Sequence, residues 1–416
     1  MTLPLAIRAL RSRDYRLFVA GQLVSLIGTW MQMIAQSWLI YRLTGSAVLL
    51  GLAGFMAQIP VFVLAPLGGV IADRFDRRRI LIGAQAVMML LALVLAWLTF
   101  SQAVQVWHIL TLATLLGVAN AIEIPTRQSF VIQMVGREDL SNAIAINASL
   151  VNGGRLIGPA IAGMVVAAVG EAWCFLINGA SYVGVIAALM AMRVSPHPEQ
   201  ARTGTSAWAS LVEGFRFAWH TRPVRALLAV VGLVSLLGMP FTVLMPIFAD
   251  QILGGGPYAY GLLMSSAGLG ALGGSAVLTL RRNLDGLGRW IAGAAGSFGA
   301  CLILFSLSRS LMLSAALLVP AGFFMIFGIA ASNTLIQAMV PDRLRGRVLA
   351  VYSMMFMGMA PIGALLAGLM AGPVGAPETV ALGGAACVVG GLAFATRLPA
   401  LHRTARELIA AQQEPR

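Results

Sequence analysis

The chain has 416 residues, of which 59% are hydrophobic and only 10% are charged, and its mean hydropathy is +0.87. Soluble domains carry about 25% charged residues, so this composition excludes an ordinary soluble enzyme or binding module. A formal charge of +13 could suggest a nucleic-acid partner, but no nucleic-acid-binding motif accompanies it. The composition therefore indicates an integral membrane protein.

Twelve apolar stretches follow one another along the chain. A spanning helix needs roughly 20 apolar residues, because only a helix or a closed barrel satisfies its own backbone in hydrocarbon. The sequence therefore predicts an all-α protein with twelve transmembrane helices. The expected spans are residues 17–41, 48–72, 80–99, 106–124, 142–168, 172–192, 224–249, 257–280, 288–307, 311–337, 348–371 and 376–396.

Arginine residues are distributed unevenly between the two sides that these spans define. The chain has no lysine, and 25 of its 28 basic residues lie in the two terminal segments or in loops on the same side as those segments. The opposite loops hold only Arg42 and Arg309, and Arg155 lies inside a span. Because cytoplasmic loops are enriched in basic residues, both termini are expected in the cytoplasm and the protein in a bacterial inner membrane.

The two halves of the chain carry related sequences. The hexapeptide LVSLIG from Leu23 recurs as LVSLLG from Leu233, and Gly158 and Gly163 are matched by Gly363 and Gly368. A duplication of six helices explains both repeats, so two pseudo-symmetric six-helix halves are expected. The expected division is residues 1–192 for the first half, 193–223 for a cytoplasmic linker, 224–396 for the second half and 397–416 for a cytoplasmic tail.

The linker begins with proline, glycine and polar residues and then changes character. Apolar side chains recur at helical spacing among charged ones, which predicts an amphipathic helix. Such a helix could lie along the inner membrane surface or pack on the bundle as an ordinary short helix. The apolar positions are Trp208, Leu211, Val212, Phe215 and Trp219.

Two motifs resemble signatures of the major facilitator superfamily. GVIADRFDRRR, residues 69–79, resembles the signature between the second and third helices, with Asp76 where the pattern has glycine; its matching residues are Gly69, Asp73, Arg74, Arg77, Arg78 and Arg79. GRLIGPAIAG resembles the antiporter signature of the exporting branches, matched by Gly154, Gly158, Pro159 and Gly163, with Ala162 in place of a glycine.

The opening residues and the segment from Gly136 to Gly163 also look like the branch that contains the enterobactin exporter and macrolide-efflux pumps. The resemblance covers essentially the whole chain. It implies export of a small amphipathic compound, such as a drug, macrolide or siderophore, by alternating access and with protons as the expected coupling ion. A lipid or metabolite carrier, an importer and a non-transporting membrane sensor remain alternatives.

The resemblance also implies a cytoplasmic gate. In the superfamily, the loop after the second helix contacts the eleventh helix when the cytoplasmic mouth is closed. Asp73 is therefore expected to accept hydrogen bonds from Arg347 or from the first amides of that helix, because a carboxylate is stabilised at a helix N-terminus.

A polar stripe on the first helix marks the expected substrate cavity. Its residues are spaced three, four, three and four apart, which places Gln22, Ser25, Thr29, Gln32 and Gln36 on one face. A polar face avoids lipid, so it lines a cavity or makes hydrogen bonds between helices. The repeat adds Ser235 and Thr242, and the expected cavity set also includes Asn120, Asn152 and Asn333.

Two ionisable residues lie near or within spans. Glu123 is expected near the inner end of the fourth helix, and Arg155 near the midplane on the fifth. Glu123 could couple proton entry to cargo exit, with Arg155 setting its proton affinity. A charge pair that only locks the two helices is the equal alternative. The arginine that many drug/proton antiporters carry on helix four is replaced by Ala113, so coupling through that position is not expected.

The sequence lacks the residue patterns of metal sites, nucleotide-binding loops and catalytic sites. The four histidines show no metal-ligand spacing, and no phosphate-cradling loop or convergent catalytic set occurs. The sequence therefore predicts neither an enzyme nor a bound metal, cofactor or ATP. The expected partners are a small-molecule substrate, protons and the lipid bilayer, and a monomer is expected.

Overall fold

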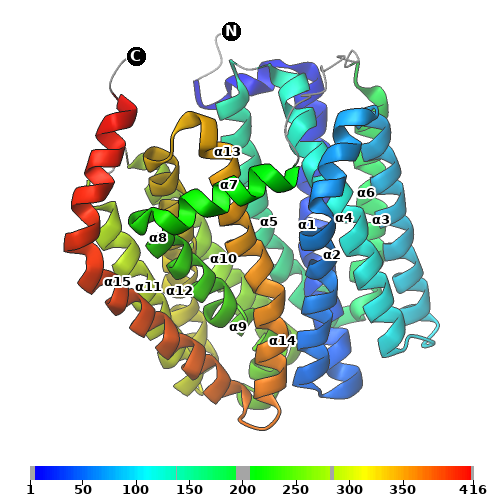
Figure 1. Ribbon diagram of the computed structural model, residues 1–416. Coiled ribbons are helices and arrows are strands. Elements are labelled where there is room, and N and C mark those ends of the chain that lie inside the picture. Colours follow the sequence, from blue (N-terminus) through cyan, green and yellow to red (C-terminus); the bar gives the residue numbers. More distant parts are fainter. Residues whose placement is uncertain (1–4, 137, 194–206, 282–284, 414–416) are drawn as a thin grey trace. The chain divides into compact units, whose positions relative to one another are not determined.

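The computed structural model describes residues 5–136, 138–193, 207–281 and 285–413. Within these ranges all regular structure is helical, and twelve helices are long and apolar enough to cross a membrane. The predicted all-α fold with twelve spanning helices is confirmed. Figure 1 shows the helices coloured along the chain.

Six long helices make up the first half. A short 3-10 helix (Leu5–Arg11) leads into α1, where the Ser12 hydroxyl accepts a hydrogen bond from the amide of Tyr15 and so caps the helix. The bounds are α1 (Arg13–Thr44), α2 (Ala47–Arg74), α3 (Arg77–Phe100), α4 (Val106–Val135), α5 (Leu140–Val169) and α6 (Glu171–Ala191).

The second half is less regular, because its seventh and eleventh spans contain π-helical turns. The linker helix is α7 (Ala207–His220). The seventh span is built from α8 (Arg222–Leu233), η2 (Val234–Gly238), α9 (Phe241–Ile247) and η3 (Phe248–Ile252). The others are α10 (Gly256–Leu280), α11 (Leu287–Leu307), α12 (Leu311–Met339), the run α13 (Asp342–Ser353), η4 (Met354–Gly358) and α14 (Met359–Ala371), and α15 (Ala376–Gln413).

Two helices end far beyond their expected bounds. The fourth span was expected to end at residue 124, but α4 continues to Val135, and the segment expected as a tail after residue 396 is helical through Gln413. Both extensions contain glutamine and arginine residues, which favour a helix. Hydrophobicity marks where a helix leaves the bilayer and not where the helix ends, so the sequence-based bounds were too short.

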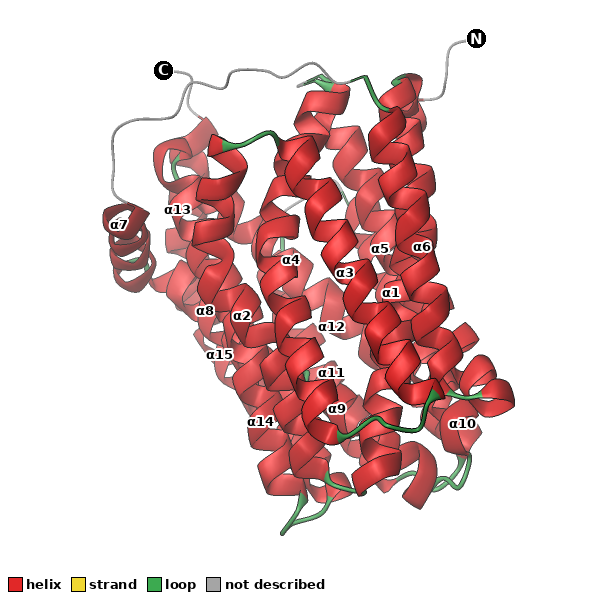
Figure 2. Ribbon diagram, turned by 90° about the vertical axis from the view of Figure 1, so that its right-hand side faces the viewer, coloured by secondary structure: helices red, strands yellow, loops and turns green. Residues whose placement is uncertain are grey.

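The helices divide into two compact units. Unit 1 consists of Met1–Leu49, Met56–Thr203 and Gly254–Ser265, and unit 2 of Leu50–Phe55, Gly204–Leu253 and Ser266–Arg416. In unit 1, α1 packs against α5 and α6, and α3 packs against α4 and α6. In unit 2, α11 packs against α12 and α15, and the linker helix α7 packs against α13, as Figures 1 and 2 show.

Each unit contains a close contact between two glycines. In unit 1, a Cβ built on Gly261 would lie 2.5 Å from the Pro159 carbonyl oxygen and 2.8 Å from the Gly163 Cα. In unit 2, a Cβ built on Gly51 would lie 2.5 Å from the Ala364 carbonyl oxygen and 2.9 Å from the Gly368 Cα. Gly51 and Gly261 are 210 residues apart in the sequence, the same offset as the repeated hexapeptide. The duplicated sequence therefore makes the same backbone contact twice.

Candidate transport site

The polar stripe of α1 is turned into unit 1. Gln22, Ser25 and Gln32 are buried, whereas Thr29 and Gln36 are half-buried. The Thr29 hydroxyl donates to the carbonyl oxygen of Ser25 at 2.8 Å, which satisfies this hydroxyl within the helix. The side chains therefore share one inward face, as the spacing predicted.

Asn178 of α6 holds the centre of this stripe. Its amide nitrogen donates to Oε1 of Gln32 at 2.7 Å and lies 3.5 Å from the Tyr182 hydroxyl. The Ser181 hydroxyl in turn donates to the Asn178 carbonyl oxygen at 2.7 Å. Gln32 thus makes the hydrogen bond between helices that the sequence left open as an alternative to a cavity role. Asn178 was missed, although a lone asparagine in an apolar span was the available signal.

Glu123 is buried in α4 and pairs within its own helix. Its Oε1 accepts a hydrogen bond from Nε of Arg127, one turn later, at 2.9 Å. Nη1 of Arg127 also donates to Oδ1 of Asn147 in α5, at 3.4 Å. The sequence already placed Arg127 on the same face of the fourth helix as Glu123, although the apolar span was expected to end at residue 124. Since α4 continues, the i, i+4 spacing brings the two charges together.

Arg155 does not pair with Glu123 in this structure. Its guanidinium carbon lies over the ring of Trp30 in α1, 5.2 Å from the ring centre. Within the described part of the chain no carboxylate lies at ion-pair distance from Arg155. The stack on Trp30 is a cation–π contact, and neither its partner nor its type was expected from the sequence.

The four matched residues of the antiporter motif make two packing contacts. A Cβ on Gly158 would lie 2.5 Å from Cβ of Trp30, and one on Gly154 would lie 3.1 Å from the ring of the same tryptophan. Pro159 and Gly163 approach Gly261 of α10, as described above. The small residues therefore bring α5 close to α1 and α10, and this approach also places Arg155 on Trp30.

The charged segment after α2 makes contacts within itself and with the end of α6. Asp73 pairs with Arg77 at 3.7 Å, and Arg78 donates to the carbonyl oxygens of Leu189 and Met190 at the end of α6, at 2.7 and 2.6 Å. Asp76 caps α3 by accepting from the amide of Arg79 at 2.8 Å. The departure from the superfamily pattern at this position is thus a helix cap.

The other expected gate residues, Gly69 and Arg74 of α2 and Arg347 of α13, differ in their surroundings. Arg74 is exposed, and a Cβ on Gly69 would meet no atom within 4 Å. Arg347 forms an ion pair with Glu213 of the linker helix α7, and a Cβ on Gly214 would lie 2.6 Å from the Arg347 carbonyl oxygen. The linker helix therefore docks on α13, whereas Val212, Phe215 and Trp219 are exposed. A latch between Asp73 and Arg347 stays a prediction.

The expected cavity residues of unit 2 make hydrogen bonds within that unit. The Ser235 hydroxyl donates to the Phe356 carbonyl oxygen at 2.8 Å, and the Thr242 hydroxyl donates to the Met239 carbonyl oxygen at 3.1 Å. Asn333 accepts a hydrogen bond from the amide of Gln337, one turn later. In unit 1, Asn120 and Asn152 are half-buried.

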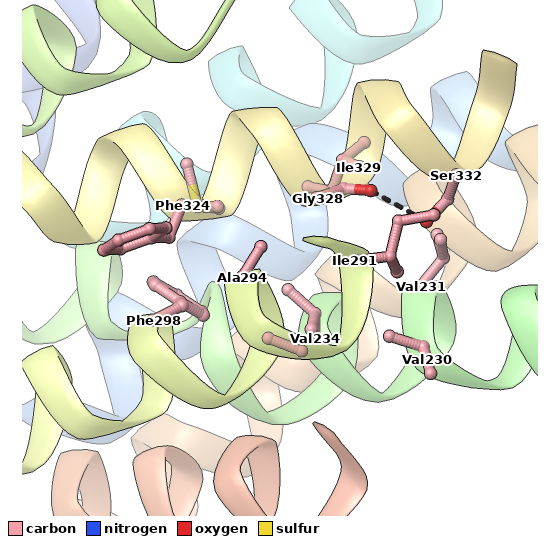
Figure 3. Close-up of a pocket in the computed structure, with 12 residues that line it drawn as sticks. Val230, Val231, Val234, Ile291, Ala294, Phe298, Phe324, Gly328, Ile329 and Ser332 are labelled. Carbon is pink, nitrogen blue, oxygen red and sulfur yellow. Dashed lines mark hydrogen bonds between the residues drawn. The ribbon is translucent and has the colours of Figure 1, made fainter. Parts of the chain in front are cut away.

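Unit 2 also contains an apolar gap between the seventh, ninth and tenth spans. Figure 3 shows hydrophobic side chains around it, including Val231, Phe298 and Phe324. The only side-chain oxygen among its lining residues is the hydroxyl of Ser332, which donates to the Gly328 carbonyl oxygen at 2.7 Å. This gap of unit 2 is therefore apolar, whereas spanning helices of unit 1 carry buried amides and charges.

Comparisons with known proteins agree with this architecture. A family model described as a transmembrane secretion effector matches residues 5–415. The chain is 25% identical to the staphyloferrin A transporter of Staphylococcus aureus, over 88% of this chain and 92% of that protein. It is 26% identical to the multidrug efflux pump Tap of Mycolicibacterium fortuitum, over 85% and 88% of the two chains.

Macrolide efflux protein A of Streptococcus pyogenes is 24% identical, over 88% of this chain and 91% of that protein. Among solved structures, a bacterial homologue of the human lysosomal transporter Spinster, inward-facing and unoccupied, matches with a TM-score of 0.70, 15% identity and full coverage of both chains. The nucleoside transporter NupG matches with a TM-score of 0.72 and 11% identity, over 92% and 98% of the two chains. At these identities the solved structures support the fold alone.

Proposed function

Because the chain belongs to the transmembrane secretion effector family of the major facilitator superfamily, we propose that it exports a small amphipathic compound by alternating access. A drug, a macrolide or a siderophore is the cargo class that the names of its relatives favour. The protein is a multi-pass membrane protein. Its bacterial relatives and its arginine distribution support an inner-membrane location with both termini in the cytoplasm.

One observation carries the proposal beyond family membership. Spanning helices of unit 1 hold the Glu123 carboxylate, the guanidinium groups of Arg127 and Arg155 and a hydrogen-bonded pair of buried amides. Ionisable groups inside a membrane are costly, and where they occur they mark substrate and ion pathways. A scaffold that only held helices together could use apolar packing instead, so this polar set supports passage of a polar or charged compound.

We assign proton coupling to Glu123 and Arg127. Glu123 is a buried acid with Arg127 as its counter-charge, so a movement that separates the two would leave an unpaired carboxylate inside the protein, and a proton could then take the place of Arg127. A movement of α4 relative to Asn147 of α5 would change this pair directly, because Asn147 also contacts Arg127. Arg127 thus takes the role that the sequence had suggested for Arg155.

Proton release from everted membrane vesicles tests this assignment. Vesicles acidified inside are monitored with a fluorescent pH probe while amphipathic cations, macrolides and catecholate siderophores are added. We expect the cargo to cause proton loss with the natural protein, and Glu123→Gln to reduce that loss to background, because glutamine cannot bind the proton. Glu407→Gln is the matched control, since Glu407 is an exposed acid near the end of α15.

The same vesicles distinguish coupling from a structural role. Exchange of labelled cargo at zero gradient needs a folded carrier but no net proton movement, so Glu123→Gln should retain it. Loss of exchange together with loss of folded protein would instead identify Glu123 and Arg127 as a pair that only stabilises α4. Undiminished proton release by Glu123→Gln would reject the coupling role.

A further inference from the structure

Arg155 lies at the middle of its helix. At 1.5 Å per residue it is about 22 Å from the first residue of α5 and about 21 Å from the last. Arginines near helix ends can extend their charge to the membrane surface, but one at this depth must face protein or a water-filled cavity. Arg155 is half-buried, so it is not completely enclosed by the protein.

The charge of Arg155 is not balanced by a neighbouring acid. Two other arginines in the spanning helices of unit 1 do have carboxylate partners: Arg42 pairs with Glu171 at 2.7 Å and Arg127 with Glu123 at 2.9 Å. Among the residues that the structure describes, the recorded contact of the Arg155 guanidinium is the ring of Trp30. Since Arg127 neutralises Glu123, that carboxylate would repel an approaching anion only weakly.

Among the described residues, the N–H donors of Arg155 have no recorded hydrogen-bond acceptor besides the contact with the Trp30 ring. A guanidinium that lies over an aromatic ring uses its face, whereas its N–H donors point outward in its own plane. This planar fork matches the two oxygens of a carboxylate. Asn152, three residues earlier on the same face of α5, is also half-buried and can donate or accept a further hydrogen bond.

We propose that Arg155, oriented by Trp30, binds a carboxylate of the transported compound, with Trp30 beside the aromatic or apolar body of that compound. The inference rests on the proposed export function and narrows the cargo to amphipathic molecules that carry an acidic group. A cargo whose only charge is positive would be repelled by Arg155.

Two dyes that differ in one group test the proposal. Rhodamine 110 has a free carboxylate, and rhodamine 123 is its methyl ester. Full-length protein in lipid nanodiscs is titrated with each dye and followed by fluorescence anisotropy. We expect rhodamine 110 to bind at least about tenfold more tightly than rhodamine 123, as hydrogen bonds to charged groups are strong.

Three variants locate the preference. Arg155→Gln should remove it, so that both dyes bind equally. Arg155→Lys should keep part of it, because lysine retains the charge but lacks the planar fork. Arg289→Gln, which removes an exposed arginine at the start of α11, should keep all of it. Each variant is first shown to be folded by its monodisperse elution and its helical circular dichroism.

The outcomes separate this inference from the proposed function. Equal binding of the two dyes by the natural protein, binding of neither, or a preference retained in Arg155→Gln would overturn the carboxylate site. Export is scored independently, by efflux of both rhodamines and of catecholate siderophores from cells that contain the natural protein. Absence of all efflux with a clear dye preference would reject export and keep the anion site, whereas efflux without a preference would do the reverse.

Discussion

The first span of each half occupies an equivalent place in the duplicated sequence, yet the two spans are built differently. α1 is a continuous helix of 32 residues, whereas the seventh span, Arg222–Ile252, contains two π-helical turns. Ser25 and Ser235 are related by the repeat. The first lies on a stripe of amide side chains, and the second donates across to the backbone of another π-helical turn, at Phe356.

This difference separates the chemistry of the two equivalent spans. On α1, Gln32 accepts a hydrogen bond from the side-chain amide of another helix, that of Asn178 in α6. In unit 2, the equivalent span packs beside an apolar gap, and the recorded hydrogen bonds of Ser235 and Thr242 to oxygen go to backbone carbonyls (Figure 3). A π-helical turn leaves backbone groups without their usual partners, and such turns are frequent at functional sites. The two halves therefore share the close contacts between glycines, whereas the polar side chains of their first spans make different hydrogen bonds.

The largest effects on stability are expected at the glycines that pack closely in both halves. A Cβ on Gly158 would meet Cβ of Trp30 at 2.5 Å, and one on the repeat-related Gly363 would meet the Leu236 carbonyl oxygen at 2.3 Å. Gly158→Ala and Gly363→Ala should each lower the free energy of unfolding by about 1–3 kcal/mol, because the helices must separate. Thermal unfolding in detergent, followed by circular dichroism, measures both changes.

The controls for this pair are glycines with free space in the same spans. Gly153 in α5 and Gly346 in α13 have nothing within 4 Å of a built Cβ. Alanine at either position should be neutral or stabilising by up to about 1 kcal/mol, because alanine favours the helix. A large loss in only one half would show that the framework is not shared.

A smaller effect is expected from the amide pair of unit 1. Asn178→Leu leaves the buried Gln32 without its partner and should cost about 1–2 kcal/mol of unfolding free energy. Gln32→Leu combined with Asn178→Leu should recover part of this loss, because no unpaired amide remains. A double-mutant cycle on thermal stability measures the coupling, and strictly additive effects would show that the two amides do not depend on each other.

The smallest effect on the free energy of unfolding is expected at Ser235, the residue of unit 2 that the repeat relates to Ser25. Ser235→Ala removes the hydroxyl that donates to the Phe356 carbonyl and should cost about 0.5–1 kcal/mol. Ser235→Thr, which keeps a hydroxyl, is the matched comparison in the same unfolding assay. A loss as large as that of Asn178→Leu would remove the distinction drawn between the two units.

The sequence predicted all twelve spans, because hydrocarbon admits few alternatives to a long apolar helix. It also predicted that the stripe of α1 faces inward, because polar side chains avoid lipid. The contacts of those side chains depend on how far each helix rotates about its axis and where it ends. The spacing of Glu123 and Arg127 placed them on one face of the fourth helix, but their ion pair was not predicted, and Asn178 contacts Gln32 because α6 turns that face toward α1.

Trp30 could not be predicted from the sequence as the neighbour of Arg155. Their contact requires Gly154 and Gly158 to let the α5 backbone approach α1, which is a property of two helices together. The antiporter resemblance had marked these glycines without indicating what lies against them. Motif residues could therefore be located from the sequence, whereas the surfaces that they bring together needed three-dimensional coordinates.

The two glycine contacts also provide internal markers for aligning distant chains. A Cβ on Gly51 or Gly261 would meet main-chain atoms, which cannot turn aside as a flexible side chain can. A distant chain that keeps this fold should therefore hold very small residues at both positions. At 11% to 15% identity with the solved structures, such paired positions can fix the alignment of each half where overall identity cannot.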